Sequence, residues 1–521
     1  MGCPVPTRYS GQGSSFAFTA IRRKMGERLR GPVRTRLLEL IVFGPLWGLI
    51  AREIVVHALR SRLNLLEAHF QARFYVRQYA QGVRRIRVER APLLHYVLVG
   101  WREGRSPSPD FDPIFYRQSQ PHSDCGGDPL FHYVTIGQHA RAQRHECDQV
   151  GDHHGCGDAE EAVLTINHAR GGGSARFLQL FEEQLRLEGR NVLRLRAVNN
   201  APTLGVIHDR SGPGTAAEAH VFDLATERAD LGIFAQQRRV RRLLLNHWVD
   251  RPVEMMDWVR DLADRLTCSY DVVLHDYYSV CPRINLVDGE GLFCGLPPAS
   301  VCGNCVRRDG AEVPVGPESW RNAVRHFLAG ADRLIVPSHD CADRLRPFLP
   351  RDAMVWEPES DEMLPPERGT RILDNEPLRV AILGALNVPK GLFVVRELAE
   401  RARRTQAPLR FMVIGPASDP EALRKVGVSV SGPYASSEMD RLLASSDPHL
   451  VFLPAVWPET WSFVLTTALR HALPVAAFAR GAPAERLRRL GRGILLPTEW
   501  IGRPDEVLQA FLSLRQRWIQ R

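Results

Sequence analysis

The stretch LRVAILGALNVPKGLFVVRELAERARR, residues 378–404, combines an apolar run, a glycine turn and a segment with helical spacing. The first run is as short as a buried strand, and apolar residues recur at three- and four-residue intervals after Gly391. A nearly continuous apolar strand followed by an amphipathic helix is typical of a parallel sheet with helices on its faces. The stretch therefore predicts one strand–helix unit of a doubly wound domain.

The same alternation continues on both sides of this stretch. The downstream runs are LRFMVIGPA (409–417), VSVSGPY (428–434), LVFLPA (450–455) and PVAAFA (474–479). The upstream runs are AVLTINHA (162–169), NVLRLRAV (191–198), RRLLLNHW (241–248), DVVLHDYY (271–278) and RLIVPS (333–338). A Pro/Glu-rich joint at 357–368 separates the two series. The sequence predicts an α/β fold with two Rossmann-like domains, 160–356 and 369–521, that face each other across a cleft.

Length and composition limit the class of protein. A chain of 521 residues with 44% apolar content can build two or three domains with real cores. The formal charge is +9, carried almost wholly by arginine, because lysine occurs only at Lys24, Lys390 and Lys425. Acidic residues lie between the basic ones, so no nucleic-acid partner is expected. Ten cysteines in a chain of this size do not indicate a disulfide scaffold.

Residues 1–60 form a basic leader with the apolar run LLELIVFGPLWGLIA at 37–51. No cleavable signal peptide is evident, because the run comes late and lacks a small-residue cleavage site. The run is short for a transmembrane helix and contains Glu39 and Pro45. Two interpretations stay open. The preceding arginines and Trp47 favour an anchor at the surface of anionic lipid, and the alternative is a helix buried against the next domain.

Residues 61–150 contain an internal repeat. The segment APLLHYVLVGWREGRSP (91–107) is echoed by DPLFHYVTIGQHARAQ (128–143), with His95 and His132 at equivalent positions. Aromatic and aliphatic residues recur at helical spacing in both copies, which predicts a mainly α-helical region whose copies pack on each other. We interpret both histidines as hydrogen-bonded core residues, with ligand binding as the alternative.

Glycines and charged residues stand where the strands of the second domain are predicted to end. They are Gly384, Lys390, Gly391, Gly415 and Glu459, with Glu485 at the start of the last helix. The carboxyl ends of parallel strands share one edge of a sheet, so these groups are expected to line one cleft. A glycine turn before a helix N-terminus binds anions, and Lys390 adds positive charge. A buried Glu459 needs a partner or a function, because an unpaired buried carboxylate is costly.

Several segments together resemble a known enzyme family. LGALNVPKG, VIGPASD, VSVSGPYASSEMDRLL, LPAVWPETWSFVLTTAL and ALPVAAFARGAPAERLRRLGRGILLP follow the order seen in retaining glycosyltransferases of family four. INHARGGGSARF resembles that family's N-terminal glycine loop, and HYVLVGWREGRSPSPDFDP resembles a repeat found beside bacterial polysaccharide glycosyltransferases. The resemblance covers about residues 160–515 and implies the GT-B fold. It also implies sugar transfer from a nucleotide diphosphate sugar, with retention and without a catalytic metal.

The resemblance assigns donor-side roles residue by residue. Lys390, with backbone N–H groups near Gly384 and Gly391, would hold the donor phosphates, and Gly415 and Glu485 would line the same side. Glu459 matches the first glutamate of the family's paired-glutamate motif, which contacts the donor sugar. The second glutamate, which binds the ribose, falls at Thr467. The arginine that usually precedes the lysine is absent from GALNVPK.

The first domain would supply the acceptor side. Gly172 and Gly173 belong to the glycine loop, and His247, His275 and Asp276 end predicted strands. His275 is the first candidate for contacting the acceptor or the transferred sugar, so it joins Glu459 as a catalytic candidate. The alternative for each strand-end residue is a polar group that caps a neighbouring helix.

The resemblance also bears on partners and location. It implies a nucleotide diphosphate sugar as donor and a polysaccharide or lipid-linked glycan as acceptor. We expect a cytoplasmic protein. Whether it also associates peripherally with the inner face of the cytoplasmic membrane stays open. The alternative function is a degenerate, non-catalytic module that binds glycan or nucleotide sugar in an assembly complex. It is suggested by Thr467 and by the missing arginine.

Four cysteines cluster in CPRINLVDGEGLFCGLPPASVCGNC, residues 281–305. The spacing C-x12-C-x7-C-x2-C ends in a knuckle typical of zinc sites, and four thiolates complete a closed tetrahedral site. We therefore predict a structural zinc bound by Cys281, Cys294, Cys302 and Cys305. Two disulfides are the alternative and require an oxidising compartment.

Overall fold

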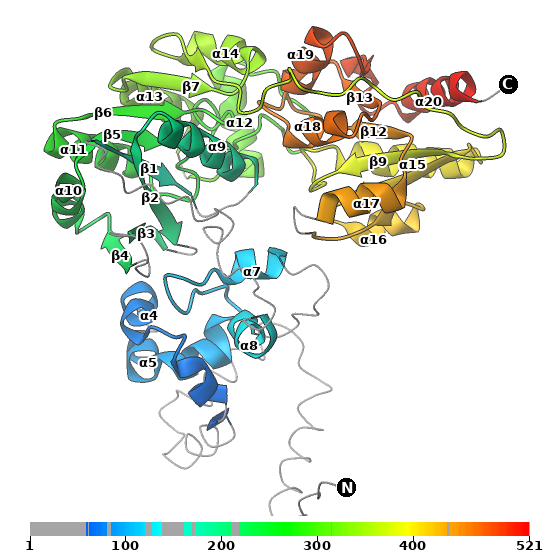
Figure 1. Cartoon of the computed structure of the whole chain (residues 1–521). Helices are drawn as coiled ribbons and strands as arrows, with labels where there is room; N and C mark the ends of the chain where they lie inside the picture. The colour runs from blue at the N-terminus through cyan, green and yellow to red at the C-terminus, as the bar shows by residue number, and fades with distance from the viewer. Residues whose placement is uncertain are drawn as a thin grey trace, which may run out of the picture.

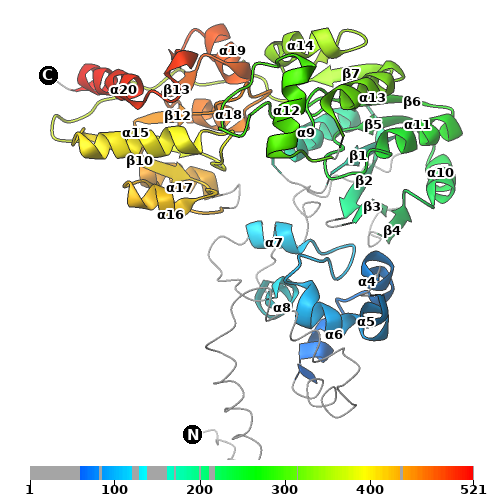
Figure 2. The same ribbon diagram turned by 180° about the vertical axis from the view of Figure 1, so that it is seen from behind.

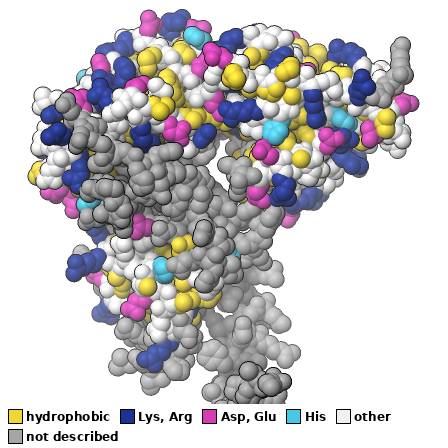
Figure 3. All heavy atoms as spheres, viewed as in Figure 1, with side chains coloured by type: hydrophobic (Ala, Val, Ile, Leu, Met, Phe, Trp, Pro, Cys, Tyr) yellow, Lys and Arg dark blue, Asp and Glu magenta, His cyan; other side chains and the backbone are white. Residues whose placement is uncertain are grey.

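The computed structural model describes residues 59–60, 62–80, 85–119, 128–137, 161–168, 172–198, 201–209, 218–313, 315–434 and 438–519. Two α/β domains lie side by side, and a smaller helical region lies below the first of them (Figure 1). Basic and acidic side chains are intermingled over both domains on the face shown in Figure 3. The apolar run 37–51 lies outside the described ranges. Within those ranges, no helix has both the length and the apolar character needed to span a membrane.

The first domain is built on an eight-stranded sheet in the order β4-β3-β2-β1-β5-β6-β7-β8. Its strands are β1 (Ala162–Asn167), β2 (Asn191–Val198), β3 (Ala201–Asp209), β4 (Glu218–Asp223), β5 (Val240–Leu245), β6 (Ser269–Val273), β7 (Arg333–Val336) and β8 (Met354–Val355). β3 pairs antiparallel with both of its neighbours, and the other pairs are parallel. The sequence pattern did not predict β3 and β4. They extend the sheet because the short connection after β2 permits only an antiparallel return.

Helices cover both faces of this sheet (Figure 2). They are α9 (Gly173–Leu187), α10 (Arg228–Gln237), α11 (Met255–Leu266), α12 (Ala299–Asp309), α13 (Pro317–Ala329) and α14 (His339–Leu345). The strand order changes direction at β1, which lies between β2 and β5. Ligands of open α/β sheets bind beyond the carboxyl ends of the strands at such a switch point. The ends of β1 and β5 are therefore where a site is expected.

The second domain has an all-parallel sheet in the order β11-β10-β9-β12-β13-β14, the 3-2-1-4-5-6 order of a Rossmann domain. The strands are β9 (Leu378–Leu383), β10 (Leu409–Ile414), β11 (Ser429–Val430), β12 (Leu450–Leu453), β13 (Val475–Phe478) and β14 (Ile494–Leu496). The helices are α15 (Leu392–Arg404), α16 (Pro420–Lys425), α17 (Met439–Ser446), α18 (Phe463–Arg470), α19 (Gly481–Arg489) and α20 (Pro504–Trp518). The switch point lies between β9 and β12.

The position of β9 between two cores explains why its sequence is mostly apolar. Val380 and Ile382 face one core of the second domain, whereas Ala381 and Leu383 face another. Successive side chains of a strand point to opposite faces, so both faces of this sheet are covered by helices. The prediction of two Rossmann-like α/β domains is confirmed.

The repeat copies adopt the same local structure. In the first, α4 (Ala72–Tyr79) and α5 (Arg85–Arg90) precede α6 (Pro92–His95), which continues as the π-helical turn η2 (Tyr96–Gly100). In the second, α7 (Pro113–Ser119) precedes α8 (Pro129–His132) and the π-helical turn η3 (Tyr133–Gly137). The Tyr75 hydroxyl lies 3.0 Å from Nδ1 of His95, and the Tyr116 hydroxyl lies 2.7 Å from Nδ1 of His132. Each histidine is thus hydrogen-bonded inside its own copy, as expected for a core residue.

The repeat region docks on the antiparallel edge of the first domain. Phe74 of α4 packs with Val198, Leu204 and Val206 of β2 and β3. Arg77, one turn further along α4, forms an ion pair with Glu227, just before α10. These contacts hold α4 against β3 and β4, where Figures 1 and 2 both place it.

Candidate functional site

An ion pair occupies the switch point of the second domain. Lys390 lies in the turn between β9 and α15, and Glu459 follows the neighbouring strand β12. Nζ of Lys390 contacts Oε1 of Glu459. The glutamate side chain is only 4% exposed, whereas the lysine side chain is 38% exposed. Glu459 therefore has a partner, and that partner keeps part of its charge open to solvent.

Two glycines allow the backbones around this pair to approach closely. Gly481, with φ of 72°, begins α19 so close to Glu459 that a Cβ would lie 2.6 Å from the Glu459 nitrogen. Gly391, with φ of 89°, begins α15 where a Cβ would lie 2.1 Å from the Pro454 oxygen. Any larger residue would push these segments apart, and an L-residue is disfavoured at such φ values. The two helix starts are thus held tightly around Lys390 and Glu459.

The remaining predicted donor-side residues lie on the same edge of the sheet. Gly384 follows β9, and Gly415 follows β10 in direct contact with Gly384. Thr467 lies in the second turn of α18, where its hydroxyl donates to the Phe463 carbonyl at 3.1 Å. Glu485 turns to the other domain, because its carboxylate accepts from the backbone nitrogens of His339 and Asp340 at 3.3 and 2.7 Å. Glu485 thus caps the start of α14 in the first domain.

A polar network occupies the switch point of the first domain. Asn167 and His168 end β1, Asn246 and His247 follow β5, and all four are buried. The Asn246 amide nitrogen donates to Oδ1 of Asn167 at 2.9 Å and to the Ser174 carbonyl at 3.2 Å. The Asn246 oxygen lies 2.7 Å from Nε2 of His275. Burial, and after it the electrostatic effect of the neighbouring His247, hold the pKa of His275 well below its usual value.

His247 and Asp276 bond to each other and to the backbone. Nε2 of His247 lies 2.8 Å from Oδ2 of Asp276, and Nδ1 accepts from the Val249 nitrogen at 3.0 Å. The other Asp276 oxygen accepts from the Tyr278 nitrogen at 2.8 Å. Both ring nitrogens of His247 are therefore engaged inside the protein. His275 and Asp276 are the members of this network that stay partly exposed.

The glycine loop meets the second domain. Gly172, with φ of 90°, is the residue before α9, and Gly173 is the first residue of that helix. A Cβ on Gly173 would lie 3.7 Å from the Phe463 ring, so the start of α9 faces the start of α18. The absence of a side chain here leaves the helix N-terminus accessible at the junction of the domains.

Direct contacts join the two switch points. The Thr460 hydroxyl donates to the His275 carbonyl, and the Tyr277 hydroxyl donates to the Pro458 carbonyl at 3.0 Å. The backbone on either side of Glu459 is thus tied to the backbone around His275. Sequence reasoning missed Thr460, Tyr277 and Phe463. Their positions beside Glu459 and His275 are the only signal that could have identified them.

The four clustered cysteines are brought together as free thiols. Cys302 and Cys305 lie one turn apart on α12, while Cys281 and Cys294 lie in the preceding loop. Burial raises the pKa of Cys281 to about 11, and the thiols of Cys294, Cys302 and Cys305 add to this increase. Across the described residues, the one set of three His, Cys, Asp or Glu with ligand atoms within 4.8 Å of one another is His339, Glu357 and Glu485. The four thiols are thus close enough to influence one another, but no three of their sulfurs lie within 4.8 Å of one another, as a closed tetrahedral zinc site requires.

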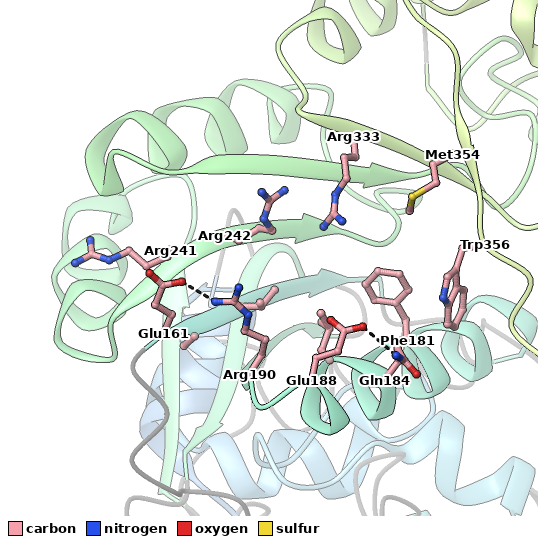
Figure 4. A pocket seen from close by; sticks show the side chains of 13 residues that line it. Glu161, Phe181, Gln184, Glu188, Arg190, Arg241, Arg242, Arg333, Met354 and Trp356 are labelled. Carbon is pink, nitrogen blue, oxygen red and sulfur yellow. Dashed lines mark hydrogen bonds and ion pairs between the residues drawn. The ribbon is translucent and has the colours of Figure 1, made fainter.

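A pocket of about 480 Å³ lies at the opposite, amino-terminal edge of the first sheet. Arg190, Arg242 and Arg333 line it together with the rings of Phe181 and Trp356 (Figure 4). Arg190 pairs with Glu161, and Arg242 and Arg333 both pair with the buried Asp271. Ion pairs with protein carboxylates thus neutralise much of the positive charge of the pocket. The pocket also lies away from the strand ends that carry the polar network.

Comparisons with known proteins place the chain among distant neighbours. No protein-family model and no curated protein matches it. It is similar to HepE from Anabaena in complex with UDP, at 13% identity and a TM-score of 0.40 over 68% of this chain and 95% of that one. It is similar to sucrose-phosphate synthase from Thermosynechococcus elongatus, at 15% identity and a TM-score of 0.43 over 68% and 90%. It is also similar to the lipopolysaccharide outer core galactosyltransferase WaaB, at 10% identity and a TM-score of 0.41 over 69% and 92%.

Proposed function

We propose that this protein is a glycosyltransferase that transfers a hexose from a nucleotide diphosphate sugar, with retention, to a polysaccharide or lipid-linked oligosaccharide. The observation that carries this proposal is the pairing of Lys390 and Glu459 at the switch point of a Rossmann-ordered sheet. The neighbouring Thr460 is bonded to the backbone of His275 in the other domain. The Lys390–Glu459 ion pair is therefore connected through Thr460 to the backbone of His275, where the two α/β domains join.

Each group has a chemical task in such a reaction. The partly exposed ammonium of Lys390 would bind the diphosphate and stabilise the negative charge that develops as it leaves. The start of α15 would add backbone N–H groups, which favour phosphate oxygens. Glu459 would bind hydroxyl groups of the donor sugar once the lysine turns to the phosphates. His275 would contact the transferred sugar or the acceptor. No step requires a metal in this scheme.

The first test is binding and turnover with a panel of UDP-, GDP- and dTDP-sugars. We expect calorimetry to detect one nucleotide class, and we expect slow hydrolysis of the matching sugar nucleotide in the absence of acceptor. The released sugar, followed by NMR before mutarotation, should keep the anomeric configuration of the donor. Hydrolysis with inversion would contradict the retaining mechanism. Co-sedimentation with vesicles containing anionic lipid would test the proposed peripheral association at the cytoplasmic membrane.

The second candidate function is a non-catalytic module that binds glycan or nucleotide sugar within an assembly complex. It is favoured by Thr467, whose hydroxyl is already bonded to Phe463 and stands where the resemblance places a carboxylate. Binding of a sugar nucleotide without hydrolysis or transfer would support this alternative. Absence of binding to every nucleotide sugar in the panel would contradict the glycosyltransferase and favour a module that binds glycan alone.

We also propose that the four-cysteine loop binds a structural zinc. Its support is the donor set: four free thiols converge in a segment that packs on the first-domain core through Cys281, Cys294 and Phe293. Zinc would be held by Cys281, Cys294, Cys302 and Cys305 and would stabilise the loop by cross-linking it.

Metal analysis of the reduced protein is expected to give one zinc per chain. Cys305→Ser should lose most of this zinc and lower the thermal midpoint, because a missing thiolate opens the site. Cys268→Ser is the matched control, since Cys268 lies outside the loop and should keep the metal. Reduced wild-type protein without zinc, or a mass spectrum with two disulfides in the loop, would contradict the proposal.

A further inference from the structure

The amide of Asn246 has a fixed orientation. Asn246 is fully buried, and its Nδ2 faces the carbonyl oxygen of Ser174 at the start of α9. A backbone carbonyl can only accept a hydrogen bond, so the amide nitrogen must lie on this side. The second bond of Nδ2, to Oδ1 of Asn167, agrees with that assignment. The Asn246 oxygen must therefore face His275.

This orientation determines which ring nitrogen of His275 carries hydrogen. The Asn246 oxygen can only accept, and it lies 2.7 Å from Nε2, so Nε2 must be the N–H donor. Burial and His247 keep the ring neutral, because they lower the pKa of His275. In a neutral imidazole with hydrogen on Nε2, Nδ1 is an acceptor. Within the described ranges, no hydrogen bond to Nδ1 is found, and the residue is partly exposed.

The neighbouring carboxylate is directed elsewhere. Nδ1 of His247 accepts from the Val249 nitrogen, so Nε2 of His247 donates to Asp276. The two imidazoles lie parallel, with centroids 6.0 Å apart, and only His247 is bonded to a carboxylate. In histidines that act as general bases, a carboxylate stabilises the imidazolium that forms. His275 is bonded to a neutral amide instead, which favours a ring that stays uncharged.

We propose that Asn246 is a positioning residue that holds His275 in the Nε2–H tautomer, so that Nδ1 accepts a hydrogen bond from a substrate hydroxyl. A lone pair recognises a group that can donate, so this position suits a sugar hydroxyl and disfavours a phosphate oxygen. The assignment of a sugar hydroxyl as the ligand of Nδ1 rests on the proposed function, whereas the assignment of the tautomer does not. The Thr460 hydroxyl donates to the His275 carbonyl, which joins the backbone of His275 to the residue that follows Glu459.

The test is the tautomer of His275 in the full-length protein labelled with ¹⁵N-histidine. Long-range ¹H–¹⁵N correlation distinguishes protonated from unprotonated ring nitrogens, and His275→Gln identifies the signals. We expect wild type to show hydrogen on Nε2 alone. Asn246→Asp keeps the volume of the side chain but places a carboxylate beside Nε2, so both nitrogens should become protonated. Asn246→Leu removes the acceptor, so signals of both neutral tautomers should appear.

Activity is the second measurement, with UDP-glucose hydrolysis as the probe. Both Asn246 variants should lower kcat/KM about tenfold, the value of one hydrogen bond. Thr165→Val is the matched control, because it removes a buried bond from β1 to Glu182 (2.6 Å) without touching His275. It should change neither the tautomer nor the rate.

The two measurements separate the possible failures. Hydrogen on Nδ1 of His275 in wild type, or a neutral Nε2–H ring in Asn246→Asp, would overturn the inference. A changed tautomer without loss of rate would overturn the role in positioning. If the tautomers change as expected but wild type hydrolyses no sugar nucleotide, the proposed function fails while the control of His275 by Asn246 stands.

Discussion

Replacing Asp361 by asparagine is expected to destabilise the second domain by about 3 kcal/mol, because it leaves the guanidinium of Arg486 buried without a counter-charge. The Arg486 side chain is fully buried, and its Nη2 lies 2.5 Å from Oδ1 of Asp361. Its other contacts are the Ser462 carbonyl at 3.2 Å, the Thr466 hydroxyl at 2.9 Å and the face of Trp461. None of these supplies negative charge. Urea unfolding of wild type and variant measures the loss.

The effect should depend on pH in a defined direction. Burial would raise the pKa of Asp361, but the hydrogen bonds and charges of Arg486 and Arg489 outweigh it and hold the pKa below its usual value. The unfolded state then binds more protons than the native state, so this carboxylate stabilises fully above its unfolded pKa of about 3.9. The difference between wild type and Asp361→Asn should be constant above this pH and shrink below it. A difference that grows as the pH falls would contradict the assignment.

Asp343→Ala is the control for this experiment. Asp343 pairs with Arg346 at 2.8 Å, but both side chains are more than 60% exposed, at 65% and 62%. Exposed pairs contribute little, so the variant should unfold within about 0.5 kcal/mol of wild type. An equal loss in both variants would mean that burial of Arg486 does not decide the effect.

Replacing Lys390 by methionine is expected to weaken sugar-nucleotide binding roughly 10–100-fold, the value of a charge-assisted hydrogen bond to phosphate. The same change leaves Glu459, with its 4% exposed side chain, without a counter-charge. We therefore expect a second loss, in thermal stability, that Glu459→Gln in the same chain largely restores. Calorimetry and thermal unfolding of both single variants and the double variant measure the two effects separately.

Lys425 offers a matched control in the same domain. It is an exposed lysine at the end of α16, so Lys425→Met removes the same charge without touching the site. It should keep both binding and thermal midpoint. Binding that falls equally in both variants would show a general charge effect. Unchanged binding in Lys390→Met would exclude Lys390 from the donor site.

The switch-point positions were largely predictable from the chain. Strands that are apolar at every position signal a sheet covered on both faces, and residues at strand ends must share one edge. That is why Lys390 and Glu459 were expected near each other although 69 positions separate them. The β3–β4 extension was not foreseen, because the period of a strand does not give the direction in which it pairs.

The order of residues along the chain is enough to predict the two α/β domains, the internal repeat, and the polar residues that end the strands. These features can be predicted because apolar residues recur with the period of the helix or strand that they form, and this period is visible along the chain. The hydrogen-bonding partners depend instead on how the chain folds: Glu459 pairs with Lys390, Glu485 with the start of α14, and the Asn246 oxygen with His275. A polar side chain satisfies its hydrogen bonds with whatever the packing brings within about 3 Å, and local sequence carries no record of that distance.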